Sequence, residues 1–169
     1  MKIRELESGH DIMEVNRLAG TIWHEAYRGI LSREQIAYMI ERFQSVRAVT
    51  EQLALDGYRY FLLEQPAGVP AGYCGVQLRD GRLFLSKIYL LPEARGQGLF
   101  RQVLDYLLDL CRQAGAQTIW LTVNRFNERA IRAYRRAGFR EVRTQVTDIG
   151  GGYVMDDYVM ERAAAPEKC

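Results

Sequence analysis

The pattern of apolar and polar positions predicts one strand followed by three helices in the first third of the chain. Residues at the start alternate as in a strand, and apolar residues then recur every third or fourth position, as on one face of a helix. Two of the helices begin at serines that can cap them. The expected elements are a strand at 2–6 and helices from Asp11 to about Trp23, from the Ser32–Gln35 capping box, and from Ser45 to Gly57.

The period changes to that of β-strands near residue 58. Three runs rich in β-branched and aromatic residues are separated by a turn at 66–70 and by Asp80-Gly81, a dipeptide typical of hairpin turns. Pro92 closes the third run. We therefore expect three antiparallel strands, which cover residues 58–64, 71–79 and 82–91.

Helical and strand patterns then alternate to the end of the chain. Leu99, Val103 and Leu107 mark one face of a helix, and Asn127 can cap a later one. No repeat or linker interrupts the pattern, so we expect a single domain at 1–162 and a disordered tail at 163–169. The expected elements are helices at 96–114 and 127–137 and strands at 118–123, 139–148 and 153–161.

Composition and charge narrow the classes of function. The chain has 169 residues, of which 48% are hydrophobic and 26% charged, as in ordinary globular domains. The net charge is only +2 and is scattered, which argues against a nucleic-acid-binding protein. No stretch is apolar enough for a leader or a membrane span. Three distant cysteines, with no metal-ligand spacing, favour a reducing cytoplasm and no metal: Cys74, Cys111 and Cys169.

The strongest functional signal is a strand that turns into a helix through Arg95-Gly96-Gln97-Gly98. Glycines let the backbone approach a ligand closely, and the first N–H groups of a helix attract phosphate. A Walker loop is excluded because GxxxxGK[ST] is absent. A dinucleotide fingerprint is excluded because Arg101 stands where its third glycine belongs. The junction therefore predicts a different kind of phosphate site.

This junction resembles the acetyl-CoA loop of the GNAT superfamily of N-acetyltransferases. A second segment resembles that family's other signature, with Asn127-Glu128-Arg129-Ala130, Tyr134 and Gly138-Phe139. The order of strands and helices is similar over nearly the whole chain. The resemblance implies an α+β fold, in which a mostly antiparallel sheet of about seven strands, splayed at the cofactor, carries helices on both faces.

The resemblance also implies roles for individual residues. The backbone of the strand end would pair with pantetheine, the loop N–H groups would hold the pyrophosphate, and Tyr134 would protonate the departing thiolate. The sequence departs from the family pattern at Phe100, where glycine or alanine is usual. The implied cofactor-binding residues are Ile88, Tyr89, Leu90, Arg95, Gly96, Gln97, Gly98, Leu99, Phe100, Arg101, Asn127 and Tyr134.

The residues that would bind the acetyl acceptor are less clearly indicated by the sequence. Many relatives carry a carboxylate on the strand before the loop, but this strand offers Phe84, Ser86 and Lys87, so the general base stays unassigned. In Asp156-Asp157 only one side chain can reach a pocket, since neighbours on a strand face opposite ways, and the other would be solvated. The acceptor candidates are Trp23, Tyr27, Tyr153 and Asp156.

The expected function is direct transfer of acetyl from acetyl-CoA to a primary amine of a small molecule or polyamine. Two alternatives stay open: a peptide or protein N-acetyltransferase, and a non-catalytic acyl-CoA sensor. The C-terminal hairpin can also pair across a homodimer, because its strand at 153–161 carries more apolar surface than edge strands usually expose.

Overall fold

The computed structural model describes residues 1–165 and contains a seven-stranded sheet. Its strands hydrogen-bond in the order β1-β2-β3-β4-β5-β7-β6. The β4/β5 pair is parallel, whereas the β1/β2, β2/β3, β5/β7 and β6/β7 pairs are antiparallel. The prediction of a mostly antiparallel α+β sheet is confirmed. The described residues divide into two compact units, so the single domain at 1–162 stays a prediction.

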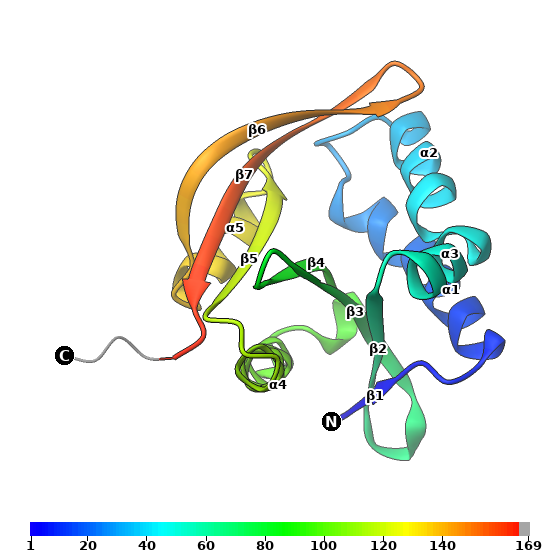
Figure 1. Ribbon diagram of the computed structural model, residues 1–169. Helices are drawn as coiled ribbons and strands as arrows, with labels where there is room; N and C mark the ends of the chain where they lie inside the picture. The colour runs from blue at the N-terminus through cyan, green and yellow to red at the C-terminus, as the bar shows by residue number, and fades with distance from the viewer. Residues whose placement is uncertain (166–169) are drawn as a thin grey trace. The chain divides into compact units, whose positions relative to one another are not determined.

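The first unit holds residues 1–77 and 86–103. Its three helices pack on one another, and α3 packs on β2 (Figure 1). The Ser8 side chain caps α1 by accepting from Asp11 N–H, and the Asp11 side chain accepts from Ser8 N–H in return, so this helix begins two residues before the expected start. Its elements are β1 (Lys2–Glu5), α1 (Gly9–Ala26), α2 (Arg33–Gln44), α3 (Val46–Leu55), β2 (Tyr58–Glu64) and β3 (Pro70–Arg79), whose last two residues belong to the second unit.

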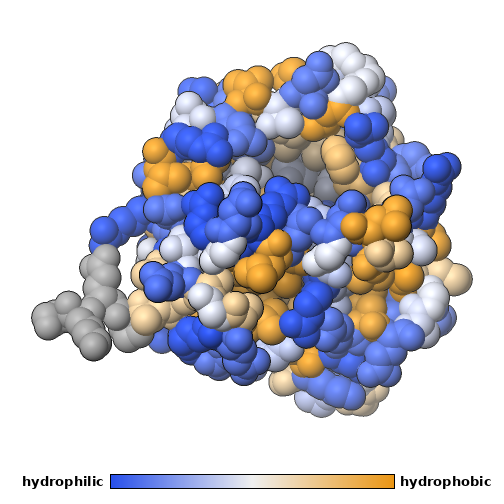
Figure 2. Space-filling model, in the orientation of Figure 1, coloured by the Kyte–Doolittle hydropathy of each residue, from blue (hydrophilic) through white to orange (hydrophobic). Residues whose placement is uncertain are grey.

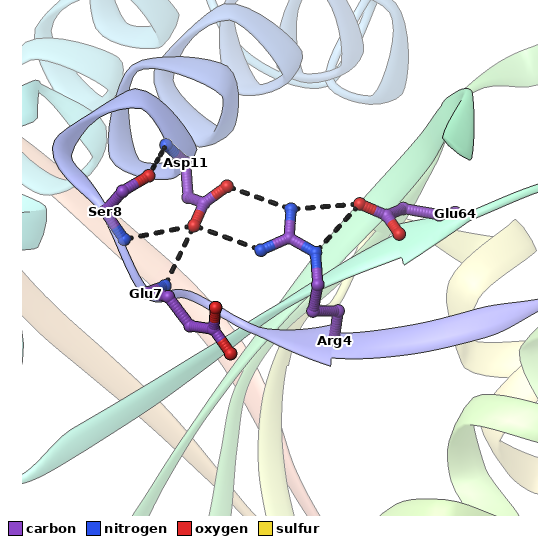
Figure 3. A network of polar contacts seen from close by, with 5 residues as sticks. All are labelled: Arg4, Glu7, Ser8, Asp11 and Glu64. Atoms are coloured by element: carbon purple, nitrogen blue, oxygen red, sulfur yellow. Dashed lines mark hydrogen bonds and ion pairs between the residues drawn. The ribbon is translucent and has the colours of Figure 1, made fainter. Parts of the chain in front are cut away.

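A network of ion pairs ties β1, α1 and β2 together (Figure 3). Arg4 donates to Asp11 at 2.9 and 3.1 Å and to Glu64 at 3.0 and 3.1 Å. The backbone N–H groups of Glu7 and Ser8 also donate to Asp11, at 2.8 and 3.1 Å. The hydrogen bonds from Arg4 hold the pKa of Asp11 well below its usual range, despite its burial. The first strand is thereby fixed to the first helix and its neighbouring strand.

The second unit holds residues 78–85 and the described residues from 104 on. Here β6 and β7 form a long curved pair, joined by a turn in which Gly150, Gly151 and Gly152 all have positive φ (Figure 1). β5 lies on the other side of β7. The elements are β4 (Arg82–Leu90) and α4 (Leu99–Gln113), which both continue into the first unit, and β5 (Thr118–Asn124), α5 (Glu128–Arg136), β6 (Arg140–Gly150) and β7 (Tyr153–Ala163).

Two expected boundaries are wrong. The helix expected from Gly96 begins at Leu99, because Gly96 and Gly98 have φ values of 75° and 73°, which are not helical. The disordered tail expected at 163–169 is wrong for its first two residues, since Ala163 lies in β7 and Ala164 is buried, with its N–H bonded to Gln117 O at 2.8 Å. The rest of that tail, residues 166–169, lies outside the described residues.

The face of the molecule drawn in Figure 2 is mixed rather than divided into large apolar and polar areas. Figure 2 shows hydrophilic and hydrophobic residues interspersed on the visible face. No helix within residues 1–165 has both the length and the apolar character to cross a membrane.

Candidate active site

The loop between β4 and α4 has the geometry of an anion-binding turn. A short 3₁₀ turn at Pro92–Ala94 precedes it, and Gly96 and Gly98 then take left-handed conformations. A Cβ at either glycine would meet nothing within 4 Å, so their role is conformational rather than steric. Within residues 1–165, the N–H groups of residues 96–98 donate no hydrogen bond. Together with the positive end of α4, they can receive a diphosphate.

Arg95 fixes this loop to the rest of the first unit. Its Nε donates to Leu90 O at 3.0 Å, and its guanidinium pairs with Glu25 of α1 at 2.7 Å. The Gln97 side chain adds a bond to Glu93 O at 2.9 Å. Glu25 thus offsets part of the positive charge that Arg95 brings to the loop. No sequence motif marks Glu25.

The end of β4 leads directly into this loop. β3 approaches it so closely that a Cβ on Gly72 would lie 2.1 Å from Tyr89 O. Leu91 N–H donates to Ala71 O at 2.8 Å. The β4/β5 register covers only Leu83–Ile119 and Phe84–Trp120, and residues 88–90 lie beyond it. This short register fits the strand-like pairing of an extended ligand along the end of β4.

An aromatic cluster surrounds the Tyr89 side chain in the first unit. Trp23 is buried and donates from Nε1 to Tyr73 OH at 2.9 Å. The Tyr27 and Tyr89 hydroxyls are 3.1 Å apart, and the Trp23 ring lies 5.3 Å from that of Tyr89. The structure thus brings together Trp23 and Tyr27, which are predicted to bind the acceptor amine, and Tyr89, which is predicted to bind the cofactor. His24, between them in the sequence, is exposed.

In the second unit, Asn127 caps α5, as predicted. Its side chain accepts from Ala130 N–H at 3.2 Å, and its own N–H donates to Asn124 O at 2.9 Å. Tyr134 in α5 is half-buried, with its ring edge against Phe139 at 5.7 Å between centroids. The last residue of β5, Asn124, thus positions the start of the helix that carries Tyr134.

The two aspartates of β7 have different surroundings. Asp156 is half-exposed and lies 3.3 Å from Arg125. Asp157 is only 6% exposed, and its Oδ1 atom has no hydrogen-bond partner within residues 1–165. Burial, with a smaller contribution from Asp156, raises the pKa of Asp157 to about 6. The buried member of the pair is therefore Asp157, whereas the sequence analysis selected Asp156. The remaining acceptor candidate, Tyr153, is half-buried at the start of β7.

Comparison with known proteins decides the family. The model of the Acetyltransferase (GNAT) family matches residues 19–139. An uncharacterised N-acetyltransferase of Mycobacterium tuberculosis is 31% identical over 153 residues, which are 90% of this chain and 97% of that protein. The chain belongs to the acetyltransferase (GNAT) family. It is an N-acetyltransferase, and its acetyl donor is acetyl-CoA.

Two further matches are also to N-acetyltransferases. The [ribosomal protein bS18]-alanine N-acetyltransferase of Escherichia coli is 36% identical over 88 residues, which are 51% of this chain and 59% of that protein. The structure of spermidine N-acetyltransferase SpeG from Vibrio cholerae, with CoA and spermine, has a TM-score of 0.68 and 20% identity. That match covers 96% of this chain and 95% of that one, and it shows a shared fold.

Sequence reasoning found the loop of this acetyltransferase and singled out the Asp156–Asp157 pair, but it selected Asp156 and missed Glu25. No recognisable motif marks Glu25, which is found through its ion pair with Arg95, and Asp157 stands out only through its burial and its unpartnered Oδ1 in the described chain. On β4, Lys87 is buried, with its Nζ 2.8 Å from Ser86 Oγ and 5.0 Å from the centre of the Tyr58 ring. The β4 residues at 84, 86 and 87 therefore provide no carboxylate base.

Proposed function

We propose that this acetyltransferase moves the acetyl group to a primary amine of a small molecule or a polyamine. The observation that carries the proposal is the open turn at 95–101, whose residues 96–98 have N–H groups without acceptors in the described chain. These N–H groups, with those of Leu99, Phe100 and Arg101, would hold the pyrophosphate of acetyl-CoA. The fold shared with SpeG supports a small amine as acceptor.

The end of β4 would orient the thioester. The backbone of Ile88, Tyr89 and Leu90 would pair with the pantetheine arm, as an added strand does. A backbone N–H of this segment would then donate to the thioester carbonyl oxygen, where negative charge grows during acyl transfer. Such a preorganised donor acts mainly on the transition state, so it accelerates the reaction rather than only strengthening binding.

Tyr134 would be the general acid. A phenol with an ordinary pKa of about 10 can protonate a departing thiolate whose thiol has a pKa of about 8.5, if the site raises the basicity of the thiolate. Asn127 would position Tyr134 by capping α5. Trp23 and Tyr27 would form an aromatic wall for the acceptor, which suits the alkyl chain and positive charge of an amine.

The Tyr134→Phe variant tests the acid role. Removing one hydroxyl should lower kcat about 100-fold, the lower end of the usual contribution of acid–base catalysis, and leave the affinity for acetyl-CoA unchanged. Tyr106→Phe in α4 is the control, since Tyr106 is also half-buried and has no proposed role. Release of coenzyme A would be followed over a range of pH. An unaltered rate throughout that range would remove Tyr134 from the mechanism.

A panel of amines tests the acceptor class. Spermidine, butylamine and a hexapeptide beginning with alanine would each be assayed for coenzyme A release. The peptide represents the second candidate function, which the 36% identity to the E. coli enzyme favours over its 88 residues. Faster turnover of spermidine or butylamine is the expected result. A preference for the peptide would replace the proposal, and no heat on titrating coenzyme A into the protein would overturn it entirely.

The β6–β7 pair would provide the surface of a homodimer. β6 is the last strand in the sheet order, and three large apolar side chains of the pair are about half exposed or more. An unpaired edge with apolar side chains favours association. These residues are Val142, Val146 and Val154. Light scattering would detect the dimer, and Val146→Lys should shift it towards monomer.

The two described cysteines are free and buried, which agrees with a cytoplasmic location.

A further inference from the structure

Asp157 lies in the middle of a three-strand segment and has no charged residue opposite it. On the two strands that pair with β7, the residues directly across from it are Asn124 of β5 and Gln145 of β6, both neutral. The side chain is 6% exposed, and its Oδ1 has no hydrogen-bond partner in the described chain. A buried carboxylate oxygen without a hydrogen-bond donor is costly, so the open Oδ1 calls for a donor that arrives from outside.

The neighbouring charges are already paired with one another. Asp156 points to the opposite side of β7 and is held by Arg125. Glu161 lies on the same side as Asp157, four residues further along, and pairs with Arg82 at 3.5 Å. Of these three acids of β7, Asp157 is the one that has neither an ion pair nor a full set of hydrogen bonds among the residues that the structure describes.

The position of Asp157 relates it to the residues with a proposed chemical role. Its neighbour across the sheet, Asn124, is the last residue of β5 and accepts the N–H of Asn127, the cap of α5. Asn124 Oδ1 is itself occupied, because it accepts from Phe126 N–H at 3.0 Å. Asp157 is thus beside the strand end from which the helix carrying Tyr134 begins.

We propose that Asp157 binds the acceptor amine and serves as its proton acceptor. The inference rests on the proposed function, and it supplies the base that β4 lacks. An ammonium group offers a positive charge and three N–H donors to a carboxylate that has an open acceptor atom. Once the amine has bound, Oδ1 gains the hydrogen bond that the chain itself does not provide.

The proton balance of the step can be written in full. The bound ammonium first loses one proton to solvent, which leaves a neutral amine with a free electron pair. Its nitrogen then forms a bond to the acetyl carbonyl carbon while the carbon–sulfur bond breaks. Asp157 takes the second proton from nitrogen, and Tyr134 gives its phenolic proton to sulfur. A water relay returns the proton from Asp157 to Tyr134, so one proton is released per turnover.

The raised pKa of Asp157 is suited to this role. A pKa of about 6 leaves the group ionised at pH 7 and able to accept a proton. It also predicts the acid side of the pH profile, since protonation of Asp157 below about pH 6 removes both the charge and the acceptor atom. Asp156 precedes it on β7, and Arg125 follows Asn124, the residue opposite it on β5; these two charged groups are paired with each other.

The test compares Asp157→Asn with Glu161→Gln, a matched control on the same side of the same strand. The acceptor is whichever of spermidine, butylamine and the alanine hexapeptide the unaltered protein acetylates fastest. Asp157→Asn should lower kcat/KM for that amine at least 100-fold and abolish the acid limb near pH 6. Asp157→Glu should retain part of the activity, and Glu161→Gln all of it. Coenzyme A affinity should be the same in all four proteins.

The outcomes separate the two proposals. If Asp157→Asn binds coenzyme A normally and keeps kcat/KM within threefold with the same acid limb, the assignment of Asp157 is wrong and the proposed function stands. If Asp157→Asn and Glu161→Gln lose activity equally, the effect belongs to the strand and the assignment is also wrong. If the unaltered protein releases no coenzyme A with any of the three amines, the proposed function itself fails.

Discussion

Asp11 and Asp157 are equally buried, each 6% exposed, yet their pKa values move in opposite directions. Asp11 accepts two hydrogen bonds from Arg4 and two from backbone N–H groups, and its pKa is held well below the usual range (Figure 3). Asp157 has a neutral residue on each side and an unpartnered oxygen, and burial raises its pKa to about 6. Depth alone therefore decides neither the charge nor the role of a carboxyl group.

This difference distinguishes a carboxyl group that stabilises the fold from one that is available to a ligand. The Arg4–Asp11–Glu64 network connects three elements and leaves Asp11 no free acceptor capacity for a ligand. Within residues 1–165, Asp157 connects no elements through an ion pair, and it keeps an acceptor atom available. A substitution in the Arg4–Asp11–Glu64 network should therefore lower the free energy of unfolding. A substitution of Asp157 should lower activity and raise the free energy of unfolding.

The largest expected effect on stability is a gain in Asp157→Asn at neutral pH. A carboxyl whose pKa rises from 3.8 to about 6 on folding destabilises the folded state as pH increases through that interval. The difference between these two pKa values corresponds to about 3 kcal/mol of unfolding free energy. The difference in unfolding free energy between variant and unaltered protein should thus grow in favour of the variant from pH 4 to pH 7.5.

Urea unfolding at a series of pH values measures this difference. The sign follows because the folded state binds more protons than the unfolded state between pH 4 and pH 6, so stability falls as pH rises there. A constant difference across the series would show that Asp157 is not perturbed, and a larger deficit of the variant at pH 7.5 would show that it has a hidden cationic partner.

The second effect is a loss of stability in Arg4→Met. Removing the guanidinium leaves Asp11 and Glu64 as buried acids without a cation, which should cost about 2 kcal/mol, between the values for surface and fully buried pairs because Arg4 is partly exposed. Arg47→Met is the control, since the Arg47–Glu51 pair is exposed, and it should show no measurable change. Urea unfolding at pH 7 would measure both. Equal losses would mean that the network contributes no more than a surface pair.

The local structure of the fold was largely predictable from the sequence. Caps at Ser32, Ser45 and Asn127 and the turn at Asp80-Gly81 are local signals, and each lies where the structure begins or reverses an element. The start of α4 was not, because the spacing of Leu99 and Val103 continues backwards into two glycines that are not helical. Periodicity identifies the face of a helix but does not define its first residue.

The candidate site was predictable only where backbone chemistry defines it. The glycine loop and the cap of α5 have sequence signatures because they need particular residue types at fixed spacing. The burial of Asp157 depends on its neighbours in the folded sheet, and the pairing of Glu25 with Arg95 joins residues 70 positions apart. Strand alternation correctly limited the Asp156–Asp157 pair to one inward member, but nothing in the sequence indicates which of the two it is.

The smallest expected effect concerns Glu161, the acid on the same side of β7 as Asp157. Its pair with Arg82 is half-exposed and 3.5 Å long, so Glu161→Gln should lower the unfolding free energy by less than about 1 kcal/mol. Arg82 would keep its position over the Trp120 ring, 5.4 Å from the ring centre, which limits the loss further. Urea unfolding in low and high salt checks this, because screening should erase a difference that comes from an exposed ion pair. A loss that persists in high salt would mean that Glu161 supports β7 through packing, and the comparison with Asp157 would then need another control.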